Sequence, residues 1–162
     1  MKRTTRLPGA ILLGAALLGA VSVSASAGAS ARTGAPAAQA ASSARVRLAR
    51  TSLGKLLVTA SGFTLYEFSK DPRNKDTCAK ARECSLTWPP LTTTGNPVAG
   101  AGVRASLLST IRLSGGTRQV TYAGHPLYTY APSGERAETF YVGASQFGGT
   151  WYAVNATGGR VR

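Results

Sequence analysis

One short pattern occurs twice in this chain, and it limits what the chain can fold into. Residues 58–68 read VTASGFTLYEF, and residues 120–130 read VTYAGHPLYTY. Val, Thr, Gly, Leu and Tyr are identical in register, and the last position is aromatic in both. A repeat of this kind usually marks a unit that cannot bury its apolar face alone, so that two copies share one core. The sequence therefore predicts two homologous units, about residues 56–100 and 110–160, in one domain spanning residues 56–162.

The remaining pattern of the domain indicates short β-strands. Residues 56–69 and 110–131 are rich in β-branched and aromatic residues and are interrupted by Gly-containing turns, which is typical of hairpins. Further strands are expected at residues 140–142 and 150–155, and one helical turn at residues 103–108. No long amphipathic helix is expected. This spacing predicts an all-β domain, either a small sandwich or barrel-like.

The alternation of side chains along a strand separates the residues of each unit into two faces. Each unit places one leucine on one face and an aromatic pair on the other: Leu65 with Tyr66 and Phe68, and Leu127 with Tyr128 and Tyr130. Two interpretations remain open. The aromatic pairs form a core layer of the sheet, or they form an exposed strip that binds a ligand.

Cys78 and Cys84 are the two cysteines of the chain. In an exported protein, an even number of cysteines favours a disulfide, here one that closes a short, charged loop. A redox-active pair and a metal site are the alternatives, but a metal would need more ligands, and His125 is the single histidine. We expect His125 to be a turn residue. Trp88 follows this loop, as Trp151 does in the second unit, and we expect both to pack rather than to form a binding platform.

The N-terminal third of the chain divides into two segments. Residues 1–31 have basic residues, then an apolar run, then small residues with Ala-x-Ala triplets, which is the order of a secretory signal peptide. The apolar run is too short to span a membrane. Residues 32–55 contain no aromatic and no acidic residue. Because such a segment buries little apolar surface, we expect a basic, flexible tether, with a short helix around residues 41–48.

The charge of the chain points to anionic partners. Nineteen Lys and Arg outnumber six Asp and Glu, giving a formal net charge of +13. A basic exported protein is attracted to anionic cell-wall polymer or to an acidic lipid surface, and the tether would be the part that binds. The alternative is that the charge only keeps the protein soluble. Nucleic acid is not an expected partner outside the cell, and the mature chain is expected to have no transmembrane segment.

Several motifs resemble a bacterial family of predicted lipoproteins described as a secreted repeat of unknown function. Residues 65–71, LYEFSKD, fit its Tyr-x-aromatic-x-x-Asp motif, which places Asp71 among the motif residues. The resemblance runs from about Leu53 to Val161 and implies an exported, envelope-associated β-domain without an assigned activity. Two features depart from the family. The lipidation Cys is absent, so the protein is expected to be secreted or wall-associated without a lipid anchor, and Ser133 replaces the motif Asp in the second unit.

No arrangement of residues in the sequence indicates catalysis. The acids are too scattered to suggest a carboxylate pair, and there is neither a phosphate-binding loop nor a nucleophile elbow. We therefore expect a non-catalytic binding or structural protein of the cell envelope, without cofactor or metal. The alternative function is an extracytoplasmic redox or electron-transfer accessory that uses the cysteines or the Tyr and Trp side chains. A hydrolase with an unrecognised site is a third possibility.

Overall fold

The computed structural model describes residues 43–162, which lie within one compact unit, Ala38–Arg162. These residues form mostly strands with one short α-helix, so the all-β prediction is confirmed, and the described strands form no closed barrel. The strands are β1 (Arg45–Thr51), β2 (Gly54–Thr59), β3 (Tyr66–Phe68), β4 (Thr92–Thr93), β5 (Val98–Ala99), β6 (Leu108–Arg112), β7 (Arg118–Tyr122), β8 (His125–Pro126), β9 (Ser145–Gln146), β10 (Gly149–Val154) and β11 (Arg160–Val161). The helix is α1 (Arg82–Thr87), and single 3₁₀ turns occur at Cys78–Lys80, Ala105–Leu107 and Ser114–Gly116.

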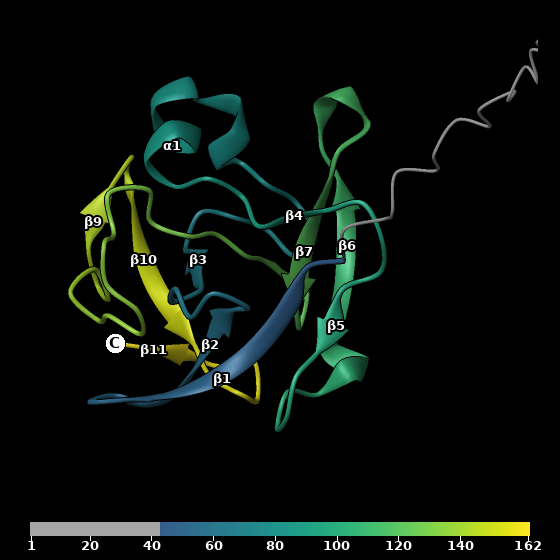
Figure 1. Ribbon diagram of the computed structural model, residues 1–162. Coiled ribbons are helices and arrows are strands. Elements are labelled where there is room, and N and C mark those ends of the chain that lie inside the picture. The colour runs from purple at the N-terminus through teal and green to yellow at the C-terminus, as the bar shows by residue number, and fades with distance from the viewer. Residues whose placement is uncertain (1–42) are drawn as a thin grey trace, which may run out of the picture. The chain divides into compact units, whose positions relative to one another are not determined.

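The strands are arranged in three small sheets (Figure 1). In the first, β1 lies between β2, which is antiparallel to it, and β5, which is parallel to it. In the second, β10 lies between β11 and β3 and also pairs with β9. In the third, β7 lies between β4 and β6 and also pairs with β8. The helical turn expected at residues 103–108 is present, whereas residues 140–142 form a turn instead of the expected strand.

The two similar sequence segments meet at their tyrosines. The Tyr66 N–H donates to the Tyr128 carbonyl at 2.9 Å, and the Tyr128 N–H donates to the Tyr66 carbonyl at the same distance. Leu65 and Leu127, which align in the sequence, are both fully buried in the same apolar cluster. Aligned positions therefore face each other within one core, as the shared-core argument expects. That the segments are homologous repeats stays a prediction.

The buried side chains form two clusters. The first is mainly aliphatic and includes Val46, Leu57, Leu65, Val120, Tyr122, Leu127 and Val154. The second combines aromatic rings with the cysteines and includes Tyr66, Phe68, Cys78, Cys84, Trp88, Tyr128 and Trp151. Since successive residues of a strand point to opposite sides, Leu65 and Tyr66 lie in different clusters, and so do Leu127 and Tyr128.

The basic segment before the domain is part of the fold, which corrects the tether predicted for residues 32–55. Residues 45–51 form β1, which pairs with β2 from Val46 to Thr51, so neither a flexible chain nor a helix reaching Leu48 is present there. Val46 is fully buried in the aliphatic cluster, and the β1 backbone forms ladders with β2 and β5, so both side-chain burial and backbone pairing contribute against the ordering cost of the strand. The signal peptide of residues 1–31 and the rest of the tether, up to residue 42, lie outside the described residues.

Candidate functional site

The aromatic residues considered as a ligand surface are mostly buried. Five of the six are at most 3 % exposed: Tyr66, Phe68, Trp88, Tyr128 and Trp151. Tyr130 is partly buried and packs against them. These side chains therefore form a core layer, and the alternative of an exposed aromatic strip is wrong for the five buried residues.

The two tryptophans are the centre of this layer. Their rings stack with centroids 4.0 Å apart and an interplanar angle of 5°. Phe68 stacks on Trp151 at 4.3 Å, and Tyr130 packs against Trp88 at 4.7 Å. Because Trp88 follows α1 and Trp151 lies on β10, the stack joins two distant parts of the chain. Stacked aromatic pairs stabilise the fold by more than the burial of their apolar surface alone would contribute.

Each buried motif tyrosine donates a hydrogen bond to a buried carboxylate. The Tyr128 hydroxyl donates to Asp71 Oδ2 at 2.6 Å, and the Tyr66 hydroxyl donates to Glu138 Oε1 at 2.8 Å. Asp71 follows Tyr66 in the first segment, and Glu138 follows Tyr128 in the second. Each acid therefore accepts its bond from the tyrosine of the other segment. Glu138 was not expected as a partner. No local signal identifies it, because Ser133 occupies the motif position and Glu138 lies five residues further on.

Burial controls the ionisation of these groups. It raises the pKa of both tyrosines above their ordinary range, and the neighbouring carboxylates raise the pKa further. Burial also raises the pKa of Asp71, while hydrogen bonds from Thr77 and Tyr128 oppose that increase. Both hydroxyls therefore stay protonated and act as hydrogen-bond donors to the two carboxylates.

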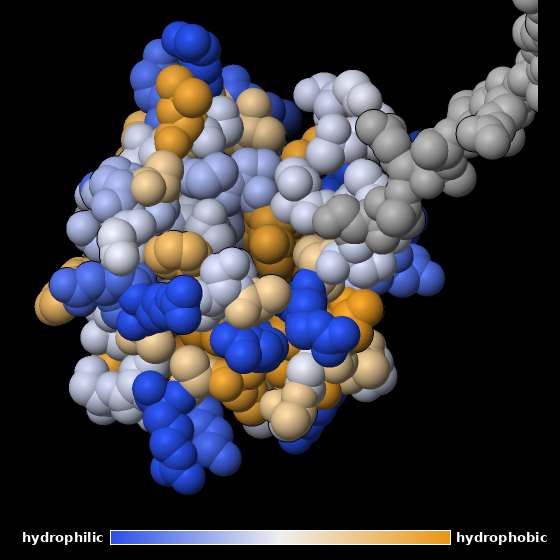
Figure 2. All heavy atoms as spheres, viewed as in Figure 1, coloured by the Kyte–Doolittle hydropathy of each residue, from blue (hydrophilic) through white to orange (hydrophobic). Residues whose placement is uncertain are grey.

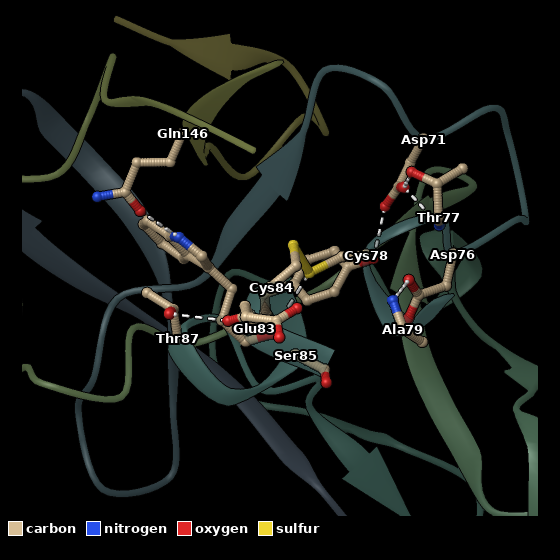
Figure 3. The surroundings of a disulfide bond; sticks show 12 residues. Asp71, Asp76, Thr77, Cys78, Ala79, Glu83, Cys84, Ser85, Thr87 and Gln146 are labelled. Carbon is tan, nitrogen blue, oxygen red and sulfur yellow. Dashed lines mark hydrogen bonds between the residues drawn. A yellow bond between two sulfur atoms is a disulfide. The ribbon is translucent and has the colours of Figure 1, made fainter. Parts of the chain in front are cut away.

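Cys78 and Cys84 form the predicted disulfide, with an S–S distance of 2.04 Å. Both are 1 % exposed. Figure 3 shows the bond between the Asp71–Thr77 hydrogen bonds on one side and Gln146 on the other. Gln146 accepts a 2.8 Å hydrogen bond from the indole N–H of Trp88, which lies in the same cluster as the disulfide. The disulfide therefore holds the loop over the tryptophan, as expected.

Glu67 is a buried carboxylate with two basic neighbours. Arg160 Nε donates to Glu67 Oε1, and His125 Nδ1 lies 3.5 Å from Oε2. The glutamate side chain is 1 % exposed, whereas Arg160 and His125 are partly exposed. Within residues 43–162 no cluster of three or more His, Cys, Asp or Glu could hold a metal ion. His125 lies at the start of β8, directly after the turn at residues 123–124, with Nδ1 close to this carboxylate.

The described part of the predicted tether belongs to the β1–β2 hairpin, which carries several exposed cations. Its cations Arg45, Arg47, Arg50 and Lys55 are all exposed, and the hairpin contains no acid. Neither ion pair found among the described residues involves them. Figure 1 shows β1 across the front of the domain, and in the same view Figure 2 shows strongly hydrophilic side chains in that region. We call these four residues the basic hairpin.

These features define a class: a small all-β domain with one buried disulfide and two buried tyrosine–carboxylate bonds. A family model described as a secreted repeat of unknown function matches residues 48–92, which confirms the resemblance over that segment. The matched segment includes the motif residues Tyr66, Phe68 and Asp71, the disulfide and Trp88, and it begins within β1. No curated protein and no solved structure matches the chain.

The family description also bears on location. A secreted family is consistent with an extracellular protein, as the N-terminal segment predicts. Among residues 43–162 there is no helix long and apolar enough to cross a membrane.

Proposed function

We propose that this protein is an exported, non-catalytic binding protein of the cell envelope that associates with anionic surface components through the basic hairpin. The observation that carries the proposal is the set of four exposed, unpaired cations on one hairpin without acids. Because the hairpin is part of the fold, the backbone positions that carry these charges are fixed. Alternate residues of a strand are about 6.6 Å apart, so Arg45 and Arg47 form a spaced pair on one face.

The buried groups support a binding role over a catalytic one. Glu67, Asp71 and Glu138 are all buried and hold hydrogen bonds or ion pairs within the fold. A catalytic acid or base must instead reach its substrate. The aromatic rings are likewise engaged in packing.

The burial of both cysteines supports a structural disulfide over the alternative redox function. Exchange requires a thiolate to reach a disulfide sulfur, and each cysteine is 1 % exposed. No observation on the described residues favours electron transfer.

The proposal is tested by retention of the mature protein on isolated cell walls and on membranes at low and high salt. Exposed charges are screened beyond about 10 Å at 0.1 M salt, so retention should fall steeply as salt rises. Replacing all four residues of the basic hairpin with Gln should abolish most of it. The control is a variant with four other exposed cations changed to Gln: Lys75, Lys80, Arg82 and Arg112.

The control variant loses the same number of positive charges, but from exposed positions outside the basic hairpin. It should keep most of its retention if the hairpin is the binding surface. Equal losses in the two variants would indicate attraction by net charge alone. Undiminished, salt-insensitive retention of the hairpin variant would overturn the proposal.

A further inference from the structure

Two exposed apolar side chains are carried by adjacent loops at the end of the basic hairpin. Leu53, in the turn between β1 and β2, is 40 % exposed, and Phe140, in the loop before β9, is 77 % exposed. The two loops contact each other, since Ser52 Oγ lies 3.4 Å from Thr139 Oγ1. Leu53 directly follows Ser52, and Phe140 directly follows Thr139. We call Leu53 and Phe140 the apolar tip.

Hydrogen bonds hold both loops in place, so the exposure is a property of the fold. In the hairpin turn, the Leu53 N–H donates to Thr51 Oγ1 at 3.1 Å, and the Thr51 hydroxyl donates to the Gly54 carbonyl at 2.8 Å. In the other loop, the Phe140 N–H donates to Glu138 Oε2 at 3.1 Å. Glu138 is buried and bonded to Tyr66, so the Phe140 backbone is attached to the core.

The apolar tip is flanked by cations. Arg50 and Lys55 are paired across β1 and β2, one position before the Thr51–Gly54 pair that closes the turn. Both are exposed. A hydrophilic anionic polymer would use these charges but would leave Leu53 and Phe140 in water. A bilayer surface offers acyl chains to apolar side chains and phosphates to adjacent cations.

We propose that the apolar tip docks on an anionic lipid surface, with Leu53 and Phe140 entering the boundary between headgroups and acyl chains while Arg50 and Lys55 contact the phosphates. This inference rests on the proposed function, since it names which anionic component the basic hairpin binds. It requires no lipid modification of the chain and no membrane-spanning helix.

The test is flotation of the mature protein with phosphatidylcholine vesicles, with and without phosphatidylglycerol. The wild-type protein should bind the mixed vesicles and bind the neutral ones much more weakly. The double variant Leu53→Ser/Phe140→Ser should lose about tenfold or more in affinity for the mixed vesicles, because the apolar contribution is removed. Leu86→Ser is the matched control: Leu86 is 60 % exposed on α1, away from the hairpin, and its substitution should leave binding unchanged.

A second measurement reports insertion directly. Tryptophan introduced as Phe140→Trp should be quenched by lipids brominated near the headgroup end of the acyl chain, whereas Leu86→Trp should not be. Trp88 and Trp151 are fully buried and give a constant background. Circular dichroism should show the same fold for all variants, so that a loss of binding is not a loss of structure.

The outcomes separate this inference from the proposed function. Wild-type binding to mixed vesicles that is unaffected by the double variant, or equal binding to neutral and mixed vesicles, would overturn docking by the apolar tip. Retention on cell walls without any vesicle binding would also overturn it, but would leave the proposed function standing. Binding to neither walls nor vesicles would overturn both.

Discussion

Tyr66 and Tyr128 show how a single buried hydroxyl can fix the position of a charged side chain. A carboxylate without partners is costly inside a protein, and a hydroxyl donor offsets part of that cost. Asp71 receives such a bond from Tyr128, in addition to two from Thr77. The motif residues Tyr66 and Asp71 are therefore connected through the second segment, and not directly to each other.

Replacing Tyr128 by Phe should destabilise the protein by about 1–3 kcal/mol at neutral pH, because Asp71 Oδ2 then loses its donor inside the core. Denaturant unfolding measures the change. Tyr66→Phe removes the donor to Glu138 Oε1 and should lower the free energy of unfolding by a similar amount. Unchanged stability in the Tyr128 variant would show that the bond contributes nothing.

The same variant should show a defined pH dependence. The Tyr128 hydrogen bond lowers the pKa of Asp71, which burial has raised, so removing the bond raises this pKa further. The folded state then holds a proton that the unfolded chain releases. Stability therefore falls as pH rises from the ordinary Asp pKa to the raised one. The deficit of the variant relative to wild type should be larger at neutral pH than in acid, and a deficit that grows in acid would contradict this.

Among the elements, β1 is the strand that amino-acid composition alone predicts wrongly, as part of a tether. Its residues are poor in large apolar side chains and rich in Arg, which is typical of a solvated linker. Yet the sequence RVRLAR alternates, and the alternation places Val46 in the aliphatic cluster while Arg45 and Arg47 stay exposed. A strand needs only a few buried side chains of its own when neighbouring strands satisfy its backbone, as β2 and β5 do for β1.

A chain that begins at Leu56 should therefore fail to fold cooperatively. It lacks β1, so β2 loses its ladder and the core loses Val46. Thermal unfolding followed by circular dichroism should show no sharp transition. A chain that begins at Ala38, where the compact unit starts, should unfold like the full chain. A cooperative transition in the shorter chain would restore the tether interpretation.

The disulfide loop is stabilised by its covalent bond as well as by packing. Changing Cys78 and Cys84 together to Ala should lower stability by about 2 kcal/mol, since closing so short a loop removes little entropy from the unfolded chain. Urea unfolding checks the value. Thiol labelling of the denatured, unreduced protein should find no free cysteine, and two reactive thiols would refute the pairing.

At the scale of the whole molecule, the two segments depend on each other. Leu65 and Leu127 are fully buried in one cluster, and the aromatic layer combines Phe68 and Trp88 with Tyr128 and Trp151. Neither half has a complete core of its own. This dependence predicts a single cooperative unit.

Leu65→Ala and Leu127→Ala should each cost about 2–5 kcal/mol, because each opens a cavity in the same cluster. Chemical unfolding followed by both circular dichroism and tryptophan fluorescence should give one coincident transition in wild type and in both variants. Stable folding of residues 53–100 alone would contradict the shared core.

The sequence by itself determined the properties that depend on neighbours along the chain: a strand-rich domain, the hairpins of residues 110–131, the disulfide, and the pairing of a leucine face with an aromatic face in each segment. The hairpin predicted for residues 56–69 is wrong as a ladder, because β2 pairs with β1 and β3 with β10, and a single bridge between Val58 and Thr64 joins its two arms. Alternation, turn residues and cysteine number are local, so they can be recognised without coordinates. Only the tertiary structure decided that β1 belongs to the domain, that the aromatic pairs are buried, and that Glu138 is the partner of Tyr66. It also brought Leu53 and Phe140 together on adjacent loops. These features depend on which surfaces meet across long separations in sequence, and the burial of a side chain is settled by what covers it.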